Sequence, residues 1–126
     1  MHPGVSASPD VSRRLAELAE QFSLPADAAA QLALLLELVE AEHSAITTVR
    51  DPREGVDVHV ADSLVALELP EVRDARRIAD LGSGAGFPGL VLAIALPQAR
   101  VTLVESVGRK VAFVSDAIER LGLGNA

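Results

Sequence analysis

Apolar residues recur at helical spacing through the first part of the chain. One stripe, preceded by a candidate N-cap at Asp10, consists of Val11, Leu15, Leu18 and Phe22. A second stripe, within a helix expected from about residue 26 to 42, consists of Leu32, Leu35, Leu36 and Val39. The pattern predicts two amphipathic helices.

The next segment combines a connector with a new helix start. The β-branched and polar residues Ile46–Val49 are poor helix formers and predict a connector. Asp51 followed by Pro52 is typical of an N-cap and the first helical position after it. We expect a helical stretch that breaks near Asp62 and ends by Pro70. Residues 1–70 are therefore predicted to form an N-terminal helical region.

After Pro70 the pattern changes to alternating strands and helices. Strands are expected at 77–81 and 100–105, and both are apolar on both faces, as buried parallel strands are. Between them lie a glycine-rich segment, 82–89, and a short buried helix, 90–96. A last helix, with Gly122 as its C-cap, is expected to bury Val111, Val114, Ile118 and Leu121. This βαβα order predicts an α/β fold with a parallel sheet within residues 71–126.

Composition narrows the functional classes. The chain has 126 residues, no cysteine, three phenylalanines as its only aromatic residues and a formal net charge of −7. The absence of cysteine excludes disulfides and thiolate metal sites, and the scarcity of aromatic residues disfavours a base-stacking platform. No metal-ligand spacing appears among the three histidines. No apolar stretch approaches the roughly 20 residues that span a bilayer, and the start lacks a signal-peptide pattern. We expect a cytoplasmic protein with no metal and no membrane segment.

The glycine-rich segment fits two classes of cofactor-binding loop. Gly84–Gly89 matches the G-x-G-x-x-G pattern of dinucleotide-binding proteins. Pro88, however, lacks one of the N–H groups that would receive the pyrophosphate at the helix start. In the second interpretation, the segment is a methyltransferase loop. Asp80 precedes Gly82-x-Gly84-x-Gly86, and this pattern resembles motif I of S-adenosylmethionine-dependent methyltransferases. That cofactor carries no phosphate, and its sulfonium and ammonium groups suit a nearby carboxylate.

Glu105 supports a nucleoside cofactor of either class. It lies 23 positions after Gly82, at the end of the second strand. A carboxylate there accepts hydrogen bonds from ribose hydroxyls. The alternative is that Glu105 is a solvated strand-end acid and that the glycines only form a tight turn.

Several segments together resemble one known family. Asp80–Gly89 (DLGSGAGFPG) closely resembles the signature of the glucose-inhibited division protein B (GidB) family, the RsmG-type methyltransferases of small-subunit ribosomal RNA. The segments His59–Leu64, Val49–Pro52 and Val101–Ser106 also fit the family, as do Arg109 and Lys110. The resemblance implies a class I, Rossmann-like methyltransferase fold. It also implies S-adenosylmethionine as cofactor, and methylation of N7 of a guanosine in 16S ribosomal RNA of the small ribosomal subunit.

The resemblance also implies roles for individual residues but identifies no catalytic side chain. Gly82 and Phe87 would contact the cofactor, Asp80 would face its methionine end, and Glu105 would hold the ribose. The remaining cofactor-site residues, which shape the loop or lie beside Glu105, would be Ser83, Gly84, Gly86 and Ser106. The simpler alternatives are core packing for Phe87, a structural role for His59, and helix capping for Asp62 and Ser63.

The sequence also departs from the family pattern. Residues 40–48 lack the usual Trp-Asn pair and the later Asn-Leu, and Val58 stands where an arginine commonly precedes the histidine. The last residues, 124–126, fall where a third strand is expected to begin. We therefore expect the N-terminal part of a methyltransferase, truncated after the second strand and its helix, and inactive and marginally stable alone. An NAD(P)-dependent oxidoreductase and a non-catalytic remnant remain as alternatives.

Overall fold

The first two helices of the computed structural model, which describes residues 9–42 and 51–126, form a packed pair. Helix α1 (Pro9–Gln21) begins before Asp10, so Asp10 is not the N-cap we expected. Its carboxylate instead accepts a hydrogen bond from Arg13 within the first turn, at 3.0 Å. Helix α2 (Ala28–Ala41) contacts α1, and both predicted apolar stripes are buried, which confirms the two amphipathic helices.

A run of short helical segments follows. Helix α3 (Pro52–Gly55) starts as predicted, because the Asp51 side chain accepts a hydrogen bond from the backbone N–H of Arg53 at 3.0 Å. The chain then continues as a π-helix, η2 (Val56–Ala61), as α4 (Asp62–Leu64) and as a 3₁₀-helix, η3 (Val65–Glu68). The predicted break at Asp62 is therefore a change of helix type. The connector expected at 46–49 lies outside the described residues.

The helical region extends slightly further than expected. Helix α5 (Pro70–Arg73) begins at the proline that we expected to end this region. Proline is well suited to a first helical turn because its missing N–H has no partner there in any case. The Arg73 side chain donates to the carbonyl of Phe22 at 2.9 Å, so α5 is tied back to the end of α1.

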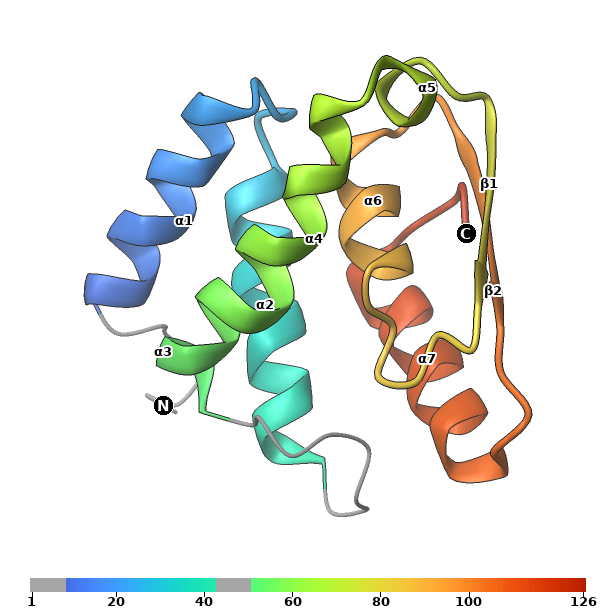
Figure 1. Cartoon of the computed structure of the whole chain (residues 1–126). Helices are drawn as coiled ribbons and strands as arrows, with labels where there is room; N and C mark the ends of the chain where they lie inside the picture. The colour runs from blue at the N-terminus through green and yellow to red at the C-terminus, as the bar shows by residue number, and fades with distance from the viewer. Residues whose placement is uncertain (1–8, 43–50) are drawn as a thin grey trace.

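The sheet consists of two parallel strands, as the βαβα pattern predicts. Strand β1 (Arg77–Leu81) pairs with β2 (Arg100–Val104) in a register that aligns Arg77 with Arg100. Helix α6 (Gly89–Ala95) connects the strands, and α7 (Gly108–Leu121) follows β2. In Figure 1 the two strands lie at one side of the molecule, with α6 and α7 between them and the first helices. Gly122 caps α7 in the left-handed conformation, as predicted.

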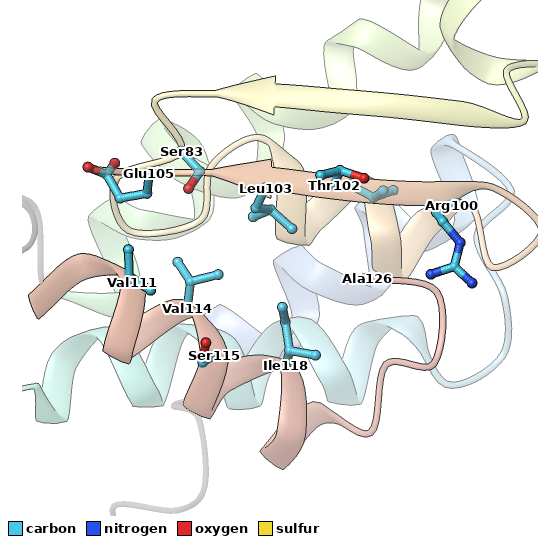
Figure 2. A pocket seen from close by; sticks show the side chains of 11 residues that line it. Ser83, Arg100, Thr102, Leu103, Glu105, Val111, Val114, Ser115, Ile118 and Ala126 are labelled. Carbon is cyan, nitrogen blue, oxygen red and sulfur yellow. The ribbon is translucent and has the colours of Figure 1, made fainter. Parts of the chain in front are cut away.

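The buried face of α7 differs from the expected one. Its buried residues are Phe113, Val114, Ala117 and Leu121. Val111 and Ile118 instead line a cavity between α7 and β2 (Figure 2). The reason is tertiary: α7 packs against α2 as well as beside the sheet, which turns a different stripe toward the core.

The buried apolar residues from α1 to α7 form one continuous cluster. Helix α6 is buried along its whole length, between the sheet and the helices α2 and α4. The strands are less covered than α6, since Leu81 is 77% exposed and Val104 is half-exposed. Although both faces of the strands are apolar by sequence, α6 and α7 cover only one of them in the described residues. None of the helices described is long and apolar enough to cross a membrane.

Candidate functional site

The glycine loop, residues 82–88, is fixed to the carboxyl end of both strands. The backbone N–H groups of Gly82 and Ser83 both donate to the carbonyl of Val104, at 2.8 and 3.0 Å. The N–H groups of Gly86 and Phe87 in turn donate to the carbonyl of Ser83, at 2.8 and 3.2 Å. The loop therefore sits at the edge where open α/β sheets bind their ligands.

The three motif glycines have different uses. Gly82, Gly84 and Gly86 all have positive φ angles, of 75°, 57° and 96°, which glycine adopts at no steric cost. A Cβ atom added to Gly82 or Gly84 would meet nothing within 4 Å, whereas one on Gly86 would collide with the side chain of Leu90. The first two glycines thus present open backbone to a ligand, and the third allows the loop to pack on α6.

Asp80 closes the loop at the start of α6. Its Oδ2 atom accepts a hydrogen bond from the backbone N–H of Gly89 at 2.9 Å. A Cβ atom on Gly89 would lie only 2.7 Å from that oxygen, so glycine is required there. Burial raises the pKa of Asp80, the hydrogen bond from Gly89 opposes this, and the charge of Glu105 adds to the rise. The site therefore places a partly buried carboxylate directly at a helix start.

Glu105 holds the other side of the loop. Its Oε1 atom accepts from the N–H of Gly84 at 2.7 Å, and its Oε2 atom accepts from the N–H of Val107 at 2.9 Å. The hydrogen bonds from Val107 and Gly84 lower the pKa of Glu105. A carboxylate offers about four lone-pair sites, so these two bonds leave acceptor capacity for a ligand. Glu105 is thus placed beside the loop, and its contact with a ribose stays a prediction.

The two serines of the predicted site have different environments. Ser83 is 2% exposed, and its hydroxyl has no hydrogen-bond partner among the described residues. It lines, together with Glu105, a cavity of about 280 Å³ between β2 and α7. Figure 2 shows these two residues at one end of the cavity and Arg100 at the other. Ser106 lies exposed next to Glu105.

Phe87 packs on a residue to which the sequence analysis gave only a structural role. Its ring is stacked on the imidazole of His59, with ring centroids 4.3 Å apart and an angle of 8° between the planes. His59 is buried in η2, while Phe87 is partly buried. The signal that could have linked them is the family element His59–Leu64. Gly89, the partner of Asp80, was likewise left off the predicted site although it belongs to the G-x-G-x-x-G match.

The described residues include no group of three or more His, Asp or Glu side chains that could hold a metal ion. The cations nearest in sequence to Glu105 are in the first turn of α7, where Lys110 contributes to lowering its pKa. The site is thus a glycine loop flanked by two carboxylates, with open backbone at Gly82 and Gly84. Such a site suits a ligand with cationic groups and an extended part that lies against bare peptide.

Comparison with known proteins gives a consistent result. Residues 27–126 match the family model of GidB, described as rRNA small subunit methyltransferase G. A protein named ribosomal RNA small subunit methyltransferase G from Xanthomonas campestris pv. campestris (strain B100) is 46% identical over 120 residues, covering 94% of this chain and 55% of that protein. Proteins of the same name from Stenotrophomonas maltophilia (strain K279a) and Myxococcus xanthus (strain DK1622) are 53% identical over 81 residues and 51% over 78. They match 64% and 62% of this chain, and 37% and 35% of their own lengths.

The mixed helix and strand arrangement with its small parallel sheet is consistent with a methyltransferase-like α/β fold. The chain belongs to the GidB family, which confirms the resemblance found in the sequence. It spans about half the length of the Xanthomonas relative.

Proposed function

We propose that this protein is an S-adenosylmethionine-dependent methyltransferase that acts on N7 of a guanosine in 16S ribosomal RNA of the small ribosomal subunit, in the cytoplasm. The names of the relatives support ribosomal RNA of the small subunit as the substrate class. In this proposal residues 71–126 contribute the first half of a Rossmann-like class I core, and residues 1–70 form the helical region beside it.

The observation that carries the proposal is the carboxylate of Asp80 at the start of α6. A dinucleotide places its pyrophosphate against free N–H groups at this helix start. Here Pro88 has no N–H, the N–H of Gly89 donates to Asp80, and the N–H of Leu90 donates to the carbonyl of Gly86 at 2.6 Å. A pyrophosphate would also be repelled by the charge of Asp80. The alternative of an NAD(P)-dependent oxidoreductase is therefore disfavoured.

The same features suit a sulfonium cofactor. Asp80 would face the cationic methionine end, and the open backbone at Gly82 and Gly84 would lie against the cofactor. Glu105 would accept from the ribose hydroxyls while it holds the loop. The remaining predicted contacts are Ser83, Gly86, Phe87 and Ser106.

The proposed reaction requires little from protein side chains. The cofactor, when bound, supplies an activated methyl group. Guanine N7 already has a free lone pair, so no base has to remove a proton before attack. Orientation of the two reactants can therefore provide most of the catalysis. The role of the described residues is to hold the cofactor in a fixed position at the loop.

The test is a calorimetric titration of the protein, extended to the full length of its relatives, with S-adenosylmethionine and, separately, with NAD. We expect S-adenosylmethionine to bind more tightly. Gly82→Val should abolish this binding because the side chain would fill the space over the open backbone. Gly122→Val is the matched control, since Gly122 also has a positive φ of 67° and open space around it but lies at the end of α7. Tighter binding of NAD, or equal effects of the two variants, would overturn the assignment.

A second measurement addresses the substrate. Small ribosomal subunits are incubated with the protein, extended in the same way, and with S-adenosylmethionine labelled in the methyl group. Label should be recovered in 16S ribosomal RNA as N7-methylguanosine, and Gly82→Val should abolish the transfer. Label recovered on another base or another atom would contradict the proposed target while leaving the cofactor assignment intact.

A further inference from the structure

The stack between His59 and Phe87 joins the helical region to the glycine loop. The two rings belong to segments 28 positions apart in the sequence and lie nearly parallel, with centroids 4.3 Å apart. We propose that His59 is a positioning residue: its ring holds Phe87, and through Phe87 the glycine loop, in the conformation that receives the ligand. The identity of that ligand rests on the function proposed above.

The His59 side of the stack is held rigidly. His59 is 8% exposed, and its neighbour Val60 and the following Leu64 are fully buried. The hydroxyl of Ser63 donates to the carbonyl of His59, which adds a contact within the helix. The preceding turn lies close to α2, since a Cβ atom on Gly55 would come within 2.8 Å of the Leu36 side chain. The imidazole is therefore attached to a turn whose neighbouring residues are anchored in the core.

The helix type at this point is unusual. His59 lies in a π-helical turn, η2, inside an otherwise α-helical run. Such turns are rare and occur frequently at functional sites, because they change the direction of side chains relative to a regular helix. Here the changed turn carries His59, whose ring stacks on Phe87 of the glycine loop. The backbone conformation of this turn thus determines the direction of the His59 side chain.

The loop needs an anchor of this kind. Three of its residues are glycines with positive φ angles, and glycine loses more conformational freedom on ordering than any other residue. Phe87 is the only aromatic residue in the loop, and its backbone N–H also fixes the turn by donating to the carbonyl of Ser83. Restraining the Phe87 ring therefore restrains the turn that presents Gly82 and Gly84.

The experiment tests whether the loop depends on the flat, stacking ring of His59 or only on the volume that its side chain fills. His59→Leu replaces the ring with an apolar side chain that fills part of the same space but cannot stack. His59→Phe replaces it with another ring that can stack. Val60→Ala is the matched control, because it weakens the same helix at the next residue without removing the imidazole. Hydrogen exchange is measured at the amides of Gly84, Gly86 and Phe87 and compared with the amides of β1.

Stacked aromatic pairs are worth enough to change a local opening equilibrium about 2- to 12-fold. We expect exchange at the loop amides of His59→Leu to accelerate by about this factor relative to β1. His59→Phe should restore the protection, and Val60→Ala should affect the loop no more than β1. Should His59→Leu destabilise the whole chain, Phe87→Leu removes the other ring from a partly exposed position and should give the same loop-specific increase.

Equal loop exchange in His59→Leu and His59→Phe would overturn the proposal, as would unchanged loop exchange in both His59→Leu and Phe87→Leu. Titration with S-adenosylmethionine then gives the functional readout: the dissociation constant should rise in His59→Leu and recover in His59→Phe. This titration uses the protein extended to the full length of its relatives. Failure of that protein, without substitutions, to bind S-adenosylmethionine would overturn the proposed function, but the exchange experiment would still decide the role of His59.

Discussion

The helical region from α1 to α4 and the strand region from β1 to α7 are stabilised in different ways. In the first, apolar side chains such as Leu32 and Leu35 on α2 are fully buried against neighbouring helices. In the second, polar side chains bind backbone groups of loops, as Asp80 and Glu105 do at the glycine loop. The glycines that present bare backbone have no side chains of their own to hold the loop, so the carboxylates of Asp80 and Glu105 bind backbone N–H groups in the loop and at its end.

Asn125 is the clearest example in the strand region. Its side-chain Nδ2 lies within hydrogen-bond distance of three carbonyl oxygens, those of Ala93, Leu96 and Ala99, at 3.0, 3.1 and 2.9 Å, so its two N–H groups are shared among three acceptors. These carbonyls end α6 and form the turn into β2. The backbone carbonyl of Asn125 also accepts from the N–H of Val101 at 2.7 Å. One residue far along the chain thus fixes the turn between the helix and the second strand.

The largest expected change in the free energy of unfolding tests the apolar packing of the helical region. Leu35→Ala removes a fully buried side chain from α2 and should lower the free energy of unfolding by about 2–5 kcal/mol. Leu81→Ala in β1 is the matched change at a position that is 77% exposed, and it should stay within about 0.5 kcal/mol. Urea unfolding followed by circular dichroism measures both. Comparable losses for the two variants would show that the sheet is as well packed as the helices.

The second prediction tests the polar contacts of the strand region, and its expected effect on the free energy of unfolding is intermediate. Asn125→Ala leaves buried carbonyl groups without their donor, which should cost about 1–3 kcal/mol. Gln98→Ala, at an exposed position in the same turn, should have little effect. The two variants are compared by the same unfolding experiment. A negligible loss for Asn125→Ala would mean that water replaces the amide and that the turn does not depend on it.

The smallest expected change in the free energy of unfolding comes from the carboxylates of Asp80 and Glu105, whose pKa values are shifted in opposite directions. The pKa of Glu105 is lowered below its ordinary 4.5, so its contribution stabilises the fold above that pH and is lost as the pH falls through the folded value. The pKa of Asp80 is raised above 3.8, so its charge is a penalty at neutral pH, which disappears as the pH falls through the raised value.

Charge-removing variants should therefore have opposite signs at pH 7. Asp80→Asn keeps an acceptor for Gly89 and should slightly stabilise the fold, whereas Glu105→Gln should destabilise it. For each variant, the difference in the free energy of unfolding from the unsubstituted chain should shrink as the pH falls. Unfolding curves between pH 3 and 7 measure this. In the titration with S-adenosylmethionine, Glu105→Gln should weaken binding about tenfold. Equal signs for the two variants at pH 7 would contradict the assigned roles.

Sequence patterns predicted the parts of the fold that depend on neighbouring residues. The stripes of α1 and α2, the Asp51 cap, both strands and the Gly122 cap all follow from local spacing or backbone preference. The glycine loop was found for the same reason, since its residues are contiguous. Membership of the GidB family could also be recognised from this loop and the segments around it.

Features that depend on distant parts of the chain were not predicted. The buried stripe of α7 includes Phe113 and Ala117 because α7 packs on α2, a contact that helical spacing alone does not reveal. The same holds for the stack of Phe87 on His59 and for the three bonds of Asn125. The exposure of Leu81 likewise depends on which elements cover the sheet, and no local pattern encodes that.

The π-helical turn has a consequence for how this segment tolerates insertions and deletions during evolution. Each residue of an α-helix contributes about 100° of rotation. A π-turn contains one residue more than an α-turn, so deleting one residue between Gly55 and His59 should return the turn to an ordinary helix with the flanking segments α3 and α4 on their present faces. The direction of the imidazole relative to those faces should then change. Val58 is 51% exposed and therefore free to vary in kind. We therefore expect the number of residues in this turn to matter more for the position of the imidazole than the side chain at Val58.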